Sequence, residues 1–354
     1  MYRRMIAWIS LALLMALATA TNTNDTQCYT VNSSKTHTVS RLRIMQYNVE
    51  WLFLKTYNNC PGSGCSWPNL ADATTHMQNV ASVIRTYNPD IVNLCEVEGC
   101  YELGQLNGLL QNAYTPYLLF GTDTSTGQNV GILTKYSPRV SLQRTSATST
   151  YPVAGSRCNY TGPGGSTGVS KHYYTEYKIN DMTVYFIGAH LLAMPTEPSR
   201  CASREAQAAV LQRLVVELLG GIDPETRHVD DNPNIGLIVS GDMNDYDAEI
   251  PDANNNHPIS IVLDILKGYA GEYALSYELY SVAAQVVKNE RYTDWWDPNG
   301  DCESSMNEMS MIDHVLMTSN LLEIVKNVTI PHPYKQYCGT FDSDHFPMII
   351  DLQF

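Results

Sequence analysis

The sequence predicts a mixed α/β (α+β) protein in which two β-sheets pack as a sandwich beneath outer helices. Three observations support this class. Apolar runs typical of strands alternate with helical periodicity in the first half of the chain, and strand-type runs dominate the second half. No fixed-period repeat and no break in composition marks a second domain. Because strands and helices do not alternate throughout, a doubly wound parallel sheet is not expected.

The expected elements follow from these patterns. Apolar runs predict strands at residues 42–49, 91–96, 130–134, 184–190, 235–241, 311–317 and 348–352. Apolar residues at helical spacing predict helices at 69–86, 103–112, 203–219 and 259–266. The segment 141–172 is rich in Ser, Thr and Gly, which is typical of a long, mobile surface loop.

Composition limits the classes of function. With 354 residues, of which 44% are hydrophobic, the chain can bury a sizeable core. The formal net charge of -14 makes a generally basic nucleic-acid-binding surface unexpected. Local cations or a bound divalent metal can still hold a phosphate ester.

The N-terminus has the pattern of a signal peptide. Arg3 and Arg4 precede an apolar run that is too short to span a bilayer, and Ala18-Thr19-Ala20 resembles a cleavage site. An uncleaved anchor is the alternative. We therefore expect a secreted, extracellular protein divided into a signal peptide at 1–20, a polar lead-in at 21–41 and a folded domain at 42–354.

Other features fit secretion. Asn-x-Ser/Thr acceptors for glycosylation occur at Asn24, Asn32, Asn159 and Asn327. Nine cysteines without C-x-x-C spacing indicate disulfides rather than a zinc site, and the odd number leaves at least one without a partner in the chain. The connectivity stays open; plausible pairs are Cys60–Cys65, Cys95–Cys100, Cys158–Cys201 and Cys302–Cys338.

Acidic, amide and imidazole side chains stand at the ends of six expected strands. Asp242 and Asn244 are two residues apart, so an extended strand end places them on the same face. Each position alone is compatible with an ordinary turn or cap. Coincidence explains one or two such positions but explains six poorly: Asn48, Glu96, His190, Asp242 with Asn244, Asp313, and Asp344 with His345.

These residues carry the chemistry of metal-assisted phosphoester hydrolysis. Glu96 and Asn48 offer oxygen ligands to a hard cation. Asp242 can orient or deprotonate a water, and Asp313 can fix the tautomer of His345.

The motifs around these residues resemble the endonuclease/exonuclease/phosphatase superfamily, in its deoxyribonuclease I-like form. They are Q-Y-N-V-E-W-L (46–52), I-V-N-L-C-E-V (91–97), G-A-H-L (188–191), G-D-M-N-D (241–245), I-D-H-V-L (312–316) and S-D-H-F-P (343–347). The resemblance implies a four-layered sandwich of two mixed β-sheets flanked by helices, with the site at one edge. It identifies residues 42–354 as the catalytic domain.

The resemblance also implies roles. Glu96, Asn48 and Asp344 would hold Mg²⁺ or Mn²⁺. Asp242 and Asn244 would position water and phosphate. The remaining catalytic positions would be His190 as a general acid and His345 oriented by Asp313.

Three positions depart from the pattern or fit it loosely. Cys95 stands where the family usually has Gln before the metal-binding Glu. No carboxylate partner for His190 is evident, and Gln128 or Asn129 would fill that place. Arg204 falls where some members clamp a phosphate; it would lie in the first turn of a helix capped by Ser203, the unfavourable end for a cation. The alternative for Arg204 is an ordinary solvated side chain.

The function expected is a secreted, Mg²⁺- or Mn²⁺-dependent phosphodiesterase that hydrolyses DNA by in-line attack of water. One alternative is a sphingomyelinase-like or inositol-phosphate phosphoesterase, in which Trp295-Trp296 would insert into a membrane. Another is an inactive extracellular binding module. The segment from Asp297 to Asp301 could hold Ca²⁺ but is expected to be a turn.

Overall fold

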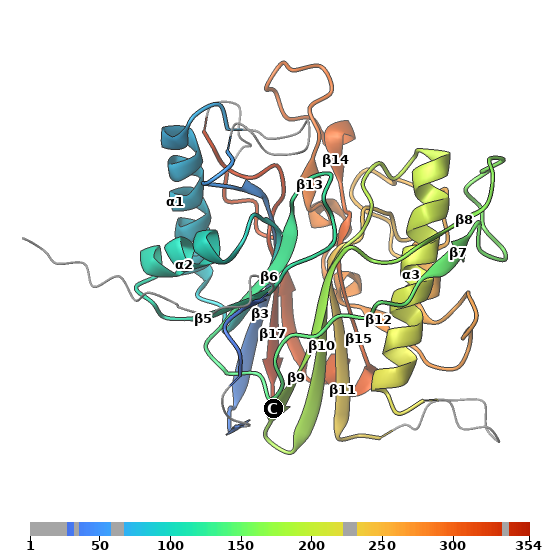
Figure 1. The fold of residues 1–354 in the computed structure, drawn as a ribbon, viewed down its shortest axis with the longest axis horizontal. Coiled ribbons are helices and arrows are strands. Elements are labelled where there is room, and N and C mark those ends of the chain that lie inside the picture. The colour runs from blue at the N-terminus through green and yellow to red at the C-terminus, as the bar shows by residue number, and fades with distance from the viewer. Residues whose placement is uncertain (1–26, 32–34, 58–66, 222–231, 335–339) are drawn as a thin grey trace, which may run out of the picture.

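The computed structural model describes residues 27–31, 35–57, 67–221, 232–334 and 340–354 as a four-layered α/β sandwich (Figure 1). Two large sheets face each other, and helices cover both outer faces. This arrangement confirms the expected fold class. The expected signal peptide lies outside the described residues.

The larger sheet has seven strands. β3 and β4 run parallel, and the other neighbours run antiparallel. Its strand order is β1 (Gln27–Cys28), β5 (Thr115–Leu119), β6 (Asn129–Thr134), β4 (Ile91–Val97), β3 (Arg41–Leu52), β17 (Met348–Gln353) and β16 (Val325–Thr329).

The second sheet has six strands and carries the parallel pairs β10/β11 and β2/β9. Its order is β12 (Tyr280–Ser281), β15 (Asp313–Met317), β11 (Ile235–Asp242), β10 (Met182–His190), β9 (Lys171–Ile179) and β2 (Thr36–His37). Two small hairpins lie outside the sandwich: β7 (Ser149–Tyr151) with β8 (Gly165–Thr167), and β13 (Asp294–Trp295) with β14 (Met309–Ser310).

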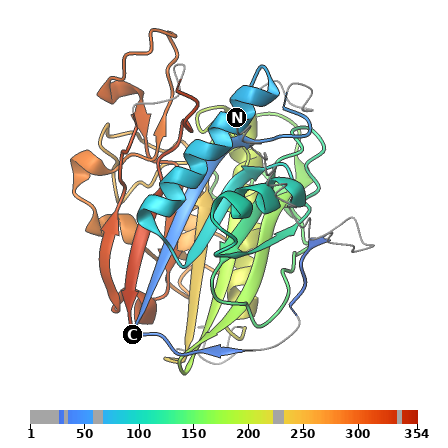
Figure 2. The ribbon, with the colours of Figure 1, turned by 90° about the vertical axis from the view of Figure 1, so that its left-hand side faces the viewer.

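The helices form the outer layers. α1 (Leu70–Tyr87) and α2 (Cys100–Leu109) cover the seven-stranded sheet, with α1 lying across β3 in Figure 2. α3 (Pro198–Leu218) and α4 (Val262–Lys267) cover the six-stranded sheet, and the short α5 (Ser319–Leu322) precedes β16. Local signals explain the bounds of α1: Asn69 accepts a hydrogen bond from the Asp72 amide, and Asn88 ends the helix in the left-handed conformation before Pro89.

Between the sheets, alternate residues of each strand build an apolar core. Ile44 and Ile91 from one sheet face Phe186 and Ile238 from the other. Toward the site end this core becomes polar: the Ser240 hydroxyl donates to Gln46 Oε1 (3.0 Å), and the Tyr173 hydroxyl donates to Asn93 Oδ1 (2.8 Å). These two buried hydroxyls therefore have hydrogen-bond partners, which removes most of the penalty of burying them.

Several expectations about local structure were wrong. α3 begins at Pro198, five residues before the expected start, with Glu197 as its cap. Residues 141–172 are not a plain loop, because they contain the β7/β8 hairpin and are tied to α3 by the Cys158–Cys201 disulfide. The lead-in supplies β1 and β2, which pair at the edges of the two sheets.

The structure tests two of the four expected disulfide pairs. The Cys158–Cys201 bridge is confirmed. Cys95–Cys100 is wrong, because Cys100 pairs with Cys28 and Cys95 is a buried free thiol inside the sandwich. Cys302 is disulfide-bonded, but Cys338, Cys60 and Cys65 lie outside the described residues. Within the described ranges, no helix combines the length and apolar character needed to cross a bilayer.

Candidate active site

Four neighbouring strands of the six-stranded sheet end in polar side chains at the same level. Lys171 pairs with His190, His190 pairs with Asp242, and Asp242 pairs with Asp313 in the register of β9, β10, β11 and β15. Directly paired residues point to the same face of a sheet. Strand pairing therefore lines these four side chains along one end of the inner face, and we call them the polar row.

The seven-stranded sheet supplies the opposite wall. Asn48 near the end of β3 lies in register with Cys95 of β4, and Glu96 follows immediately. The Asn48 Nδ2 atom lies 3.0 Å from Asp242 Oδ2, 3.4 Å from Glu96 Oε1 and 3.4 Å from His345 Nε2. One amide nitrogen thus contacts residues from three distant parts of the chain, so the structure brings the predicted residues together.

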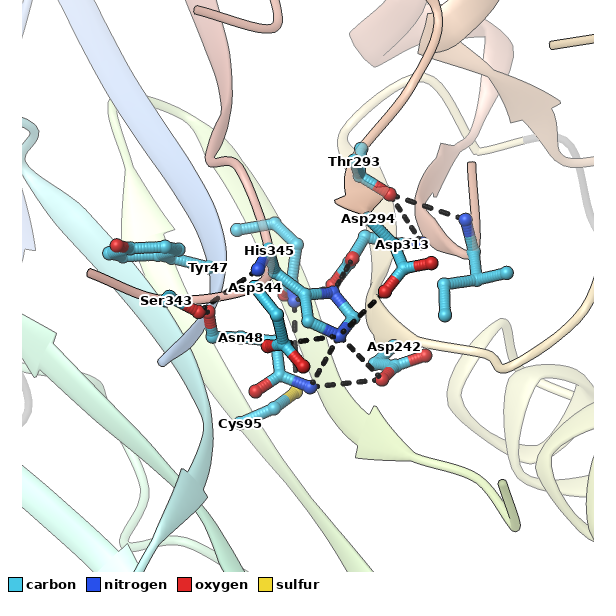
Figure 3. A network of polar contacts seen from close by, with 12 residues as sticks. Tyr47, Asn48, Cys95, Asp242, Thr293, Asp294, Asp313, Ser343, Asp344 and His345 are labelled. Atoms are coloured by element: carbon cyan, nitrogen blue, oxygen red, sulfur yellow. Dashed lines mark hydrogen bonds and ion pairs between the residues drawn. The ribbon is translucent and has the colours of Figure 1, made fainter. Parts of the chain in front are cut away.

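His345 lies at the centre of the cluster (Figure 3). Its Nδ1 atom is 2.7 Å from Asp313 Oδ2, as the sequence predicts. Its Nε2 atom is 3.6 Å from Asp294 Oδ1 and 3.9 Å from Asp344 Oδ1. The Ser343 hydroxyl donates to the Asn48 carbonyl (2.9 Å) and accepts from the His345 amide (3.1 Å), which clips the segment before β17 onto β3.

Backbone strain gathers around the same residues. Glu96 (φ 68°), Asn244 (φ 50°), Glu50 (φ 40°) and Trp51 (φ 50°) all adopt the left-handed region. Non-glycine residues rarely occupy this region, and such residues concentrate at functional sites. The bulge between Asn48 and Leu52 turns the end of β3 so that the Trp51 amide donates to Glu96 Oε2 (3.0 Å).

The cluster is charged and mostly buried. Burial and the nearby charge of Asp313 raise the pKa of Asp242, and burial and Glu50 raise the pKa of Asp344 well above its usual value. Burial would lower the pKa of His345, but Asp313 and Asp344 outweigh it and raise that pKa well above its usual value. Several carboxylates therefore compete for positive charge in one place.

A divalent cation fits this arrangement. Carboxylate oxygens of Asp294 and Asp344 lie within 4.8 Å of each other and of a ring nitrogen of His345, and those of Asp242 and Asp313 are grouped around the same imidazole within the same distance. Asp344 Oδ1 is a buried atom without a hydrogen-bond partner. Hard cations prefer such oxygen ligands, and a bound cation would relieve the repulsion between the carboxylates.

The side chain of Asn48 lies beside the carboxylates, and its role as a metal ligand stays a prediction. Its Oδ1 atom accepts from the Glu50 amide (3.1 Å), while its Nδ2 faces the carboxylates. Asn244 donates its amide N–H to Asp242 Oδ1 (2.8 Å) and its side-chain Nδ2 to the Leu191 carbonyl (3.2 Å). Asn48 thus contacts Asp242 through its side chain, and Asn244 holds Asp242 through its backbone amide.

His190 lies beside the cluster, with Nε2 3.6 Å from Asp242 Oδ2 and 3.9 Å from Glu96 Oε1. Burial and the charge of Lys171 lower its pKa well below the usual value. Its Nδ1 atom is buried and has no hydrogen-bond partner in the described part of the chain. Gln128 and Asn129 do not support it, because they bond to Lys171 and to the Glu98 carbonyl instead.

Arg204 does not reach the site. It is fully buried, because its guanidinium donates to Asp245 Oδ2 (2.9 Å) and to the carbonyls of Leu192 (2.9 Å) and Pro195 (2.9 Å). The helix α3 begins earlier than expected, so Arg204 is not in its first turn. The structure thus gives Arg204 a packing role and corrects its placement as a phosphate clamp.

Sequence analysis missed Asp294. Its backbone forms an isolated antiparallel β-bridge with His345, and the Ser310 hydroxyl donates to its Oδ2 atom (2.8 Å). Trp295 is buried and donates to Glu308 Oε2 (2.9 Å), whereas Trp296 is 69% exposed. The segment from Asp297 to Asp301 is a turn closed on Asp297 Oδ1, as expected.

The two facing sheets with this cluster at one end define a class: the deoxyribonuclease I-like α/β sandwich. Solved structures support the fold. Truncated TDP2 from Caenorhabditis elegans is similar with a TM-score of 0.51, 17% identity, and coverage of 89% of this chain and 98% of that one. A family protein from Bacteroides vulgatus is similar with a TM-score of 0.53, 15% identity, and coverage of 89% and 99%.

The family is identified from the sequence itself. The profile of the Endonuclease/Exonuclease/phosphatase family matches residues 45–345, and the chain therefore belongs to this family. Members of the family are typically phosphoester hydrolases. No curated protein matches the chain at a significant level.

Proposed function

We propose that this protein is a secreted, divalent-metal-dependent phosphodiesterase that cleaves DNA. The observation that carries the proposal is the contact of Asn48 Nδ2 with Asp242, Glu96 and His345. It joins a general base, a ligand for a hard cation and a carboxylate-oriented imidazole in one cluster. Phosphodiester hydrolysis requires these three functions together.

The chain's own residues can perform an in-line displacement. Asp242 accepts a proton from the attacking water as the new P–O bond forms, and the bond to the leaving oxygen breaks on the opposite side of phosphorus. His345, held in its charged form by Asp313, donates a hydrogen bond to a phosphoryl oxygen. Mg²⁺ or Mn²⁺, when bound, would neutralise the developing negative charge. His190, whose pKa is lowered, donates a hydrogen bond from its neutral ring to the leaving oxygen, which takes up a proton from water.

DNA is proposed as the substrate on two grounds. A solved structure of similar fold, TDP2 from D. rerio, holds a single-strand DNA product (TM-score 0.50, 16% identity). The motif around His190 resembles the deoxyribonuclease branch of the superfamily. The negative net charge is compatible with DNA because a cation in the site can hold the backbone.

A plasmid-cleavage assay tests the proposal. Mg²⁺ or Mn²⁺ should support cleavage by the purified protein, and EDTA should abolish it. His345→Ala should lose activity, whereas the exposed His257→Ala should retain it and serve as the matched control. Cleavage in EDTA, or full activity of His345→Ala, would contradict the mechanism. Inactivity of the wild-type protein on every phosphodiester would favour the binding-module alternative.

Membrane phospholipid remains a second candidate substrate because Trp296 is exposed close in sequence to Asp294. Aromatic side chains of this kind insert at membrane interfaces. If the protein acts on phospholipid, it should bind sphingomyelin vesicles, and Trp296→Ala should abolish that binding. Trp295→Ala is unsuitable here because Trp295 belongs to the core.

Secretion also belongs to the proposal. The leader at residues 1–20 motivates it, and the acceptors Asn159 and Asn327 are both exposed. N-terminal sequencing of protein collected from the culture medium should begin after Ala20. Retention of the intact leader in a cell-associated form would contradict secretion.

A further inference from the structure

Lys171 extends the polar row by one strand. It begins β9, pairs with His190, and points to the same inner face as His190, Asp242 and Asp313. Its side chain is only 9% exposed, which is unusual for a lysine and requires partners. The proposed mechanism gives this buried cation no direct role.

A short loop holds Lys171 in place. Its Nζ atom donates to Gln128 Oε1 (3.1 Å) and lies 3.7 Å from Asp123 Oδ2. Asp123 is in turn fixed by the hydroxyls of Ser125 (2.6 Å) and Thr126 (2.5 Å). The loop is pinned to the start of β9 because the Thr122 amide donates to the Ser170 carbonyl (3.0 Å).

Strand spacing sets the distance between Lys171 and the reacting centre. Neighbouring strands lie about 4.8 Å apart, so Lys171 is roughly 10 Å from Asp242 along the row. Within the described residues, none of the cluster carboxylates is within ion-pair distance of Lys171. The backbone of Lys171 is thus two strands away from Asp242, and His190 stands between them in the row.

We propose that Lys171 binds a phosphate that flanks the scissile one, so that the site favours polyanionic strands over isolated phosphodiesters. This inference rests on the proposed function and names the substrate class of the same site. A lysine acts as a point charge for phosphate, and Asp123 is the internal counter-ion that the substrate phosphate displaces. Gln128 keeps the ammonium group oriented without adding charge.

The test compares two substrates, a short oligodeoxynucleotide and bis(p-nitrophenyl) phosphate, which has no flanking phosphate. Lys171→Met should raise KM for the oligodeoxynucleotide about tenfold while kcat is retained, because one charge-assisted contact is lost. KM for bis(p-nitrophenyl) phosphate should change only about twofold. The salt dependence of oligonucleotide binding should fall by about one unit in the log–log slope.

Further variants separate binding from folding. Lys178→Met removes a half-buried lysine near the other end of β9 and should behave as wild type. Lys171→Arg should restore most of the oligonucleotide affinity. Asp123→Asn removes the competing carboxylate and should lower KM for the oligonucleotide, an effect opposite to that of Lys171→Met.

Two results would overturn the inference. Equal increases in KM on both substrates would place Lys171 at the scissile phosphate, and a loss of kcat with KM unchanged would show that it acts through His190. In both cases the wild-type protein still cleaves DNA, so the proposed function stands. A wild-type protein that cleaves neither substrate would refute the proposed function and this inference with it.

Discussion

The two histidines of the site have opposite surroundings. His345 Nδ1 lies 2.7 Å from Asp313, and further carboxylates surround its Nε2. His190 has a buried Nδ1 without a hydrogen-bond partner in the described part of the chain, and a lysine is its neighbour in the row. Electrostatics therefore favours the charged form of His345 and the neutral form of His190.

Because of this difference, the two halves of the cluster are suited to groups of opposite charge. The carboxylate-rich half around His345 is suited to holding positive charge, whether a proton or a cation. The half around His190 also borders Asp242 and Glu96, but Lys171 adds a positive charge there that is suited to anionic parts of a substrate. A phosphodiester placed between them would meet donors on both sides.

Asp313→Asn should produce the largest effect. The change removes the charge that orients and ionises His345, and we expect kcat to fall roughly 10³- to 10⁴-fold, as for other carboxylates that orient a catalytic imidazole. Steady-state kinetics on a phosphodiester measures it, with circular dichroism to confirm folding. A loss below about tenfold would show that Asp313 does not control His345.

His190→Ala should cost less. A neutral donor removed from the phosphate should lower kcat about 10²-fold, the scale of one lost transition-state hydrogen bond. If the loss equals that of Asp313→Asn, the contrast between the two histidines fails, and His190 would have to act as the proton donor. The exposed His257→Ala is again the control.

Cation binding should stabilise the carboxylate-rich half. Mn²⁺ at 100 times its Kd adds about 2.7 kcal/mol to the free energy of unfolding, so Tm should rise by several degrees over the EDTA form. Asp344→Asn should reduce this rise, whereas Lys171→Met should leave it intact. If the Tm of the wild-type protein does not change when Mn²⁺ is added, cation binding at this site is contradicted.

The pH dependence of stability should differ in sign between the histidines. The raised pKa of His345 means that its contribution is complete below about pH 6.5 and is lost as pH rises through the folded-state pKa. The lowered pKa of His190 means that the folded state loses stability as pH falls below about 6.5. Urea unfolding of His345→Gln and His190→Gln in EDTA, each compared with wild type, should show these opposite trends.

Tyr173→Phe should have the smallest effect. It deletes the hydrogen bond to Asn93 in the polar layer beneath both histidines, and we expect about 1 kcal/mol of lost stability. Activity should stay near wild type because Tyr173 does not contact the cluster. A large loss of kcat would show that this layer controls the geometry of the site.

Most of the site could be predicted from sequence because its residues occupy strand ends. Asn48, Glu96 and Asp242 lie at the ends of apolar runs, His345 precedes one, and the structure places the four together. Asp294 was missed because it belongs to a two-residue strand with no apolar run before it. Arg204 was misplaced because the start of α3 depends on Glu197 and Pro198, which the apolar periodicity does not detect.

The sequence by itself determined the alternation of apolar and polar residues along each strand, and with it the two-sheet class and the chemical types in the site. These are local properties, since side-chain direction follows from backbone period alone. Only the tertiary structure decided which strands are neighbours, and therefore that Lys171 stands beside His190, that Asp294 faces His345, and that Cys28 bonds to Cys100. Pairing between distant strands depends on the whole core being packed at once, and no local pattern carries that information.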